Sequence, residues 1–233
     1  MDTMPMAGGG TMTMAWMPMC GRSWIAAAAS FLAMWTLMMA AMMLPSLVPM
    51  LWRYRHSAGR TGGLPRVLPT ALVGAGYLLV WALLGAAIYP LGAAVMALTM
   101  RYPALAGAAP IATGLVVTTA GALQFTRWKA HHLACCRGRH SREPVRCGRA
   151  PSDGPFTALR HGLRLGLHCS QCCAGLTAVL LVSGIMDVPA MVAVTAGITL
   201  ERLAPAGERV ARAIGVVVAG AGMILIARAA VLS

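Results

Sequence analysis

The sequence has few charged residues, and most of those are of one sign. Charged side chains make up 11% of the 233 residues, against about 25% in ordinary soluble domains. Only 6 residues are acidic and 19 are basic, and aromatic residues make up just 6% of the chain. So little polar surface excludes a soluble globular enzyme, a disordered tail and a secreted disulfide scaffold.

Several functional motifs are also missing. The sequence contains no serine-type triad, phosphate loop, nucleotide fingerprint or paired-carboxylate arrangement, so no catalytic residue is predicted. The net charge of +13 would suit a nucleic-acid binder only on a polar chain. Here it lies between long apolar segments, so nucleic acid is not an expected partner.

Long apolar segments are what the chain has in abundance. Hydrophobic residues form 58% of it, and a helix needs roughly 20 of them to cross a bilayer core of about 30 Å. The sequence therefore predicts an all-α, polytopic membrane helical bundle of about six transmembrane helices, of which the fifth is short for a crossing. These candidate spans are residues 24–51, 68–96, 108–125, 161–186, 188–200 and 213–232.

The basic residues indicate an orientation for this bundle. Fifteen of the 19 fall between spans one and two, three and four, or five and six. Basic loops stay in the cytoplasm, so both termini are expected outside a bacterial inner membrane. This predicts an extracytoplasmic tail at 1–23 and a transmembrane domain at 24–233. A basic cytoplasmic loop is expected at 128–160, near anionic lipid headgroups.

The tail and the first span are rich in methionine. A tail of Met with Gly and Pro cannot pack a core, whereas thioether sulfur is a soft ligand that suits Cu(I). A low-complexity leader is the alternative for the tail, and adaptable packing is the alternative for the span. The tail carries Met4, Met6, Met12, Met14, Met17, Met19 and Cys20, and the span carries Met34, Met38, Met39, Met42 and Met43.

A second sulfur-rich group lies in the fourth span. His168 and Cys172, and Cys169 and Cys173, are spaced four residues apart, so a helix brings all four to one side of a single turn. Polar and reactive groups at membrane depth are costly and are functional suspects by default. A buried cysteine alone is usually a small hydrophobe, but three within five residues beside a histidine favour a metal site.

A third group follows the third span. His131 and Cys135, and His132 and Cys136, are i, i+4 pairs if the segment is helical. These ligands suit Zn(II) or Cu(I). Because spans three and four are consecutive, we expect this group to meet the Cys/His group of span four near the inner membrane face.

Two polar residues end neighbouring spans. Gln124 closes span three and Glu201 closes span five. Both could orient histidine ligands from outside the metal shell. Ordinary polarity at the membrane interface is the alternative.

Taken together, these motifs resemble a bacterial family of integral membrane proteins described as metal-binding. The resemblance covers about residues 34 to 205 and implies metal binding without specifying a reaction. Where the family usually has Cys, this chain has His132, which keeps a metal-ligand residue type. The motifs are Met39-Ala40-Ala41-Met42-Met43-Leu44-Pro45-Ser46, Gly76-Tyr77, Trp81, Gln124-x-Thr126-x-x-Lys129, Cys136-Arg137, Gly162, Gly166, Cys169-x-x-Cys172-Cys173, Gly184-x-Met186, Met191 and Glu201.

The leading interpretation is an inner-membrane protein that handles Cu(I), as a metallochaperone or transporter, with zinc as a second candidate metal. It implies a copper-donating or copper-receiving partner protein. One alternative is a membrane thiol-disulfide oxidoreductase that uses Cys169, Cys172 and Cys173. Another is a structural membrane subunit whose sulfur serves packing alone.

Overall fold

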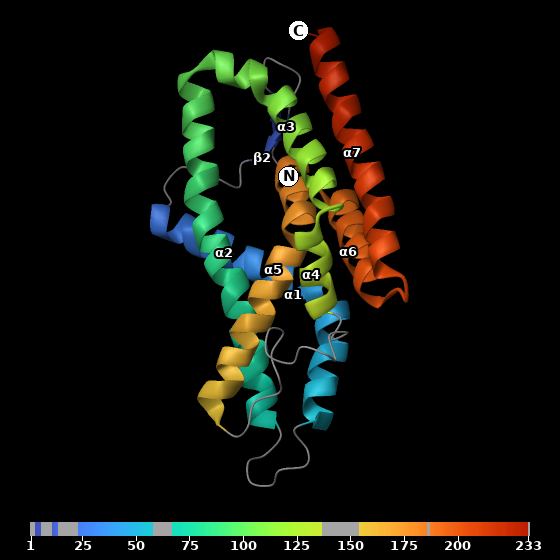
Figure 1. The fold of residues 1–233 in the computed structure, drawn as a ribbon. Helices are drawn as coiled ribbons and strands as arrows, with labels where there is room; N and C mark the ends of the chain where they lie inside the picture. Colours follow the sequence, from blue (N-terminus) through green and yellow to red (C-terminus); the bar gives the residue numbers. More distant parts are fainter. Residues whose placement is uncertain are drawn as a thin grey trace.

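The computed structural model describes residues 3–5, 11–13, 23–57, 67–136, 154–185 and 187–232. Over these residues the chain forms seven helices and one small hairpin of two antiparallel strands (Figure 1). The elements are β1 Thr3–Pro5, β2 Thr11–Thr13, α1 Trp24–Ser57, α2 Val67–Arg101, α3 Pro103–Leu123, α4 Arg127–Cys136, α5 Pro155–Ser183, α6 Val188–Leu203 and α7 Gly207–Leu232.

Five helices are long and apolar enough to cross a membrane, which indicates a membrane protein. They are α1, α2, α3, α5 and α7. The fifth predicted span corresponds to α6, which has 16 residues and falls short of the usual length of a crossing. Six spans therefore remain a prediction, as does the orientation of the termini.

The predicted loop at 128–160 contains more helix than expected. All of α4 except its first residue lies inside it, and α5 begins within it at Pro155. Proline at the first helical position fits there because its missing N–H needs no partner. Helix α5 ends at Gly184, whose φ of 115° is disfavoured for other residues.

Small residues let α2 and α5 approach closely. A methyl group at Gly162 would overlap the carbonyl of Val73, and one at Gly166 would meet the side chain of Val80. Helices α3 and α7 pack in the same way, through Gly121 of α3 against Ala219. Such contacts are typical of helix pairs in membranes, where van der Waals packing must replace the hydrophobic effect.

The core lies where α1, α2 and α5 cross. Trp35 of α1 is fully buried and donates its indole N–H to the carbonyl of Trp81 in α2 at 2.9 Å. The ends of α1 and the starts of α2 and α5 lie at one end of the molecule, and α2 meets α3 at the other (Figure 1). Helix α4 lies beside α5 near the middle, which places the cysteines of the two helices close together.

Candidate metal centre

Histidine and cysteine side chains of α4 face those of α5. The Nδ1 atoms of His132 and His168 lie 3.1 Å apart. One turn further along each helix, the thiols of Cys136 and Cys172 interact, and Cys136 packs against the small buried cluster that contains Cys172. The two predicted groups therefore meet, and we call these four residues the His–Cys face.

His132 is held in its neutral form. Burial lowers its pKa below the ordinary 6.5, and the neighbouring charges of His168 and His131 lower it further. A neutral imidazole at physiological pH has a lone pair available to a metal ion. The ring also contacts the edge of Trp128 at a centroid distance of 4.7 Å, which helps to fix its orientation.

The other two cysteines of α5 lie toward α1, α2 and α6. Cys169 and Cys173 are each 1% exposed, and their thiols interact. The hydroxyl of Tyr77 lies 2.8 Å from Cys169 Sγ, and the Cys169 thiol donates to Met43 Sδ at 3.9 Å. We call Cys169, Cys173 and Met43 the thiol cluster.

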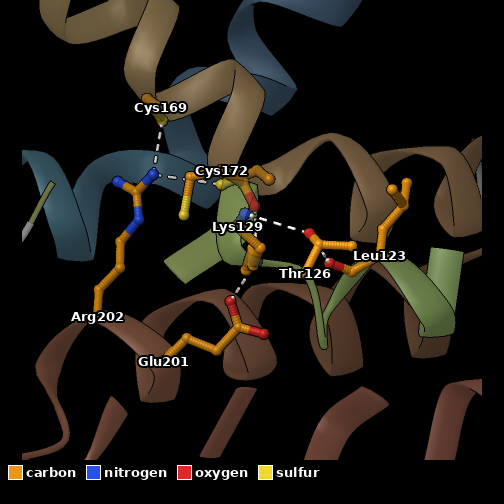
Figure 2. A network of polar contacts seen from close by, with 8 residues as sticks. Leu123, Thr126, Lys129, Cys169, Cys172, Glu201 and Arg202 are labelled. Atoms are coloured by element: carbon orange, nitrogen blue, oxygen red, sulfur yellow. Dashed lines mark hydrogen bonds and ion pairs between the residues drawn. The ribbon is translucent and has the colours of Figure 1, made fainter. Parts of the chain in front are cut away.

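An arginine contacts this cluster from the end of α6. The Nη2 atom of Arg202 donates to Cys169 Sγ at 2.9 Å (Figure 2). The same atom donates to Cys173 Sγ at 3.2 Å. Because one nitrogen contacts both sulfurs, the two sulfurs lie within about twice a hydrogen-bond length of each other. The guanidinium carries a permanent positive charge, so it is a built-in counter-ion for thiolates.

The residue before Arg202 takes part in a buried ion pair. Lys129 Nζ donates to Glu201 Oε2 at 2.7 Å and to the carbonyl of Cys172 at 2.6 Å. The side chain of Lys129 is 5% exposed and that of Glu201 is 2% exposed. This lysine therefore joins α4 to both α5 and α6, directly beside the His–Cys face (Figure 2).

Sulfur atoms form a continuous series between the two sides of α5. Cys172 interacts with Cys136 on one side and with Cys173 on the other. Cys173 in turn interacts with Cys169, which reaches Met43. Thiolate and thioether sulfur are soft ligands that select Cu(I), so the series offers such an ion neighbouring positions.

The candidate metal-ligand side chains contact one another mainly in pairs. Among the described residues, no group of three or more His, Cys, Asp or Glu side chains has an arrangement that could hold a metal ion. A structural zinc site normally has four such ligands. Cu(I) accepts fewer ligands and also accepts thioether sulfur, so paired thiols beside a methionine suit it better.

Most of the predicted ligands lie near these contacts, with differences in the methionines. Met38, Met39 and Met42 are buried with Met43 in the main hydrophobic core, where packing accounts for their position. Met43 reaches a cysteine sulfur. The methionine tail lies outside the described residues apart from β1 and β2.

One predicted ligand differs from the other cysteines in the structure. Cys135 is disulfide-bonded, whereas the sequence pattern predicted a thiol ligand there. A disulfide sulfur carries no thiolate and is therefore a poor metal ligand. His131, whose Nε2 lies 3.9 Å from Cys135 Sγ, is exposed at the rim of the site. Cys136, Cys169, Cys172 and Cys173 are free thiols.

The two polar residues at the span ends have different surroundings. Glu201 binds Lys129. The amide oxygen and nitrogen of Gln124 are buried without a hydrogen-bond partner among the described residues, and the side chain borders a cavity of about 100 Å³. Thr126 and Lys129 border the same cavity.

Two important side chains carried little signal in the sequence. Tyr77 entered only through the family resemblance, and Arg202 counted only as one of the basic residues that set the orientation. Its position directly after Glu201, at the end of an apolar segment, was the available hint. Which sulfur it meets depends on how α6 packs against α5.

The fold and the site define a class of protein: a helical membrane protein with buried cysteine and methionine side chains. The comparison with family models agrees, because residues 32–225 match the model of PpoB2, described as a copper chaperone. The chain therefore belongs to this copper chaperone family. Comparisons with curated proteins and with solved structures find no match. The family favours copper handling over the oxidoreductase and structural alternatives.

Proposed function

We propose that this chain is a multi-pass protein of the bacterial inner membrane that binds Cu(I) and passes it to a partner protein. The ion would occupy the thiol cluster and the His–Cys face, with the methionine tail as the site of first capture outside the cytoplasm. The observation that carries the proposal is the contact of Cys169 with Met43, together with the interactions that link Cys169 to Cys173, Cys172 and Cys136.

The chemistry of this series supports transfer as well as storage. A thioether binds Cu(I) without losing a proton, and a thiolate binds it more strongly. Neighbouring ligands of graded strength let an ion change partners without leaving the protein. His132 and His168 lie on the less enclosed side, since His131 beside them is exposed, and a partner could take the ion from there.

Metal content tests the proposal. The full chain is purified anaerobically in detergent, and copper and zinc are measured in wild type and in Cys169→Ser/Cys172→Ser/Cys173→Ser. Ser170→Ala is the matched control on the same helix, because its hydroxyl binds the Leu167 carbonyl and contacts no cysteine sulfur among the described residues.

We expect tightly held copper in wild type and in the control, and its loss in the triple variant. Zinc in place of copper would overturn the Cu(I) proposal. The absence of metal even after loading with Cu(I) would overturn it as well. Size-exclusion profiles of the three proteins show whether the triple variant is folded.

A further inference from the structure

We propose that Arg202 makes the thiol cluster selective for a monovalent soft cation, Cu(I), over divalent cations such as Zn(II). This inference rests on the proposed function and adds a specificity-determining residue to it. Arg202 holds both sulfurs from one guanidinium nitrogen, at 2.9 and 3.2 Å.

The net charge of the thiol cluster depends on which metal ion it holds. Cys169 and Cys173 are 1% exposed, so water does little to screen charge there. Two thiolates with Cu(I) carry one net negative charge, which the guanidinium cancels. The same two thiolates with Zn(II) are already neutral, and the guanidinium then leaves one buried positive charge. Uncompensated buried charge is strongly disfavoured.

Among the described residues, the neutral neighbours of the cluster leave this count unchanged, and Cys172, which contacts Cys173, does so in its protonated form. Met43 Sδ and the Tyr77 hydroxyl are neutral ligands or neighbours of Cys169. The nearby Lys129 and Glu201 neutralise each other across 2.7 Å. Among the described residues, Arg202 therefore brings a positive charge into direct contact with both thiol sulfurs.

Geometry also keeps the guanidinium in place. Arg202 follows Glu201 on α6, and the Lys129–Glu201 pair anchors that end of the helix to α4 and α5. A planar guanidinium has several fixed donors, so it can hold two sulfurs at once. A lysine at the same position would keep the positive charge but would carry it on one ammonium group in place of a planar guanidinium.

The experiment measures selectivity in the full chain in detergent, without oxygen. Cu(I) affinity is read by competition with a chromogenic Cu(I) chelator, and Zn(II) affinity by competition with a zinc indicator. The proteins are wild type, Arg202→Gln, Arg202→Lys and Arg209→Gln. Arg209 is exposed at the start of α7, so its variant removes a charge away from the sulfurs.

We expect the ratio of Cu(I) to Zn(II) affinity to fall about tenfold or more in Arg202→Gln, a typical effect of losing a group that supports metal ligands. Arg202→Lys should keep most of the ratio, and Arg209→Gln all of it. An unchanged ratio in Arg202→Gln, or an equal loss for both metals, would overturn the inference.

The proposed function can fail separately. If wild type does not bind Cu(I), the function itself is wrong, whatever Arg202 does. If wild type binds Cu(I) and Arg202→Gln keeps its selectivity, only the role of Arg202 is wrong. A Cys169→Ser/Cys173→Ser protein measured in parallel identifies which part of the binding belongs to the thiol cluster.

Discussion

Helix α5 contacts α2 along one side and α4 along another, and its candidate ligands divide between the two. Toward α2, Cys169 and Cys173 are buried beside Arg202, and the helices touch backbone to backbone. Toward α4, His168 is half-buried, and the contact depends on polar side chains.

The difference concerns what holds each side together. The α2 side is closed by shape, through glycines that leave no room for a side chain. The α4 side is closed by charge, through a lysine that binds both a carboxylate and a backbone carbonyl. Shape-closed packing is rigid, whereas the α4 side depends on one buried ion pair and the hydrogen bond that Lys129 makes to Cys172.

Breaking the charged contact should have the largest effect. Lys129→Met removes the cation that balances Glu201 at a site where both side chains are almost fully buried. We expect a loss of about 3–5 kcal/mol in the free energy of unfolding, because a buried carboxylate loses its counter-charge. Thermal and denaturant unfolding in detergent would measure it.

The double variant Lys129→Met/Glu201→Leu is the matched control for that loss. Removing both charges should restore most of the stability, since apolar replacements for a buried ion pair are often tolerated. If the single variant is as stable as wild type, the pair does not hold α4 in place.

Breaking the shape-closed contact should have a smaller effect. Gly162→Ala puts a methyl group into the carbonyl of Val73, so α2 and α5 must separate slightly. We expect a loss of about 1–3 kcal/mol, the usual cost of overpacking, and faster labelling of Cys169 by a maleimide.

Gly74 provides the control on the same pair of helices. A methyl group there meets nothing within 4 Å, so Gly74→Ala should be neutral or gain up to about 1 kcal/mol from helix propensity. Equal effects of the two substitutions would contradict the close packing.

The smallest expected effect is a pH dependence on the α4 side. The folded chain holds the pKa of His132 below 6.5 through burial and the charges of His168 and His131, whereas the unfolded chain titrates near 6.5. The stability of the metal-free protein is therefore complete above that pH and falls as the pH drops through it, because the unfolded state binds the proton more readily. His132→Gln should flatten the fall measured by unfolding at several pH values. Parallel curves for the two proteins would argue against a neutral buried His132.

The sequence predicted the local features well. The apolar segments became helices, and the i, i+4 spacing of His132 with Cys136 and of His168 with Cys172 holds because each pair lies within one helix. Gly162 lies against the backbone of Val73, a close approach that small residues make possible in membrane helix pairs.

Other features depended on longer-range packing. The chain turns at Gln124–Thr126 before α4, which apolar length alone did not reveal. The methionines of α1 have the same spacing in the sequence but different surroundings in the structure. Met43 contacts a cysteine sulfur, whereas Met38, Met39 and Met42 pack in the hydrophobic core.

The sequence by itself determined the helices, the soft character of the ligands and the turn on which each ligand lies, because these follow from composition and from spacing within one helix. Tertiary structure alone decided that Arg202 meets Cys169 and Cys173 and that Lys129 meets Glu201. Those contacts join residues 29 to 72 positions apart on different helices. The sequence around each of these residues does not indicate which distant residue it contacts in the folded protein.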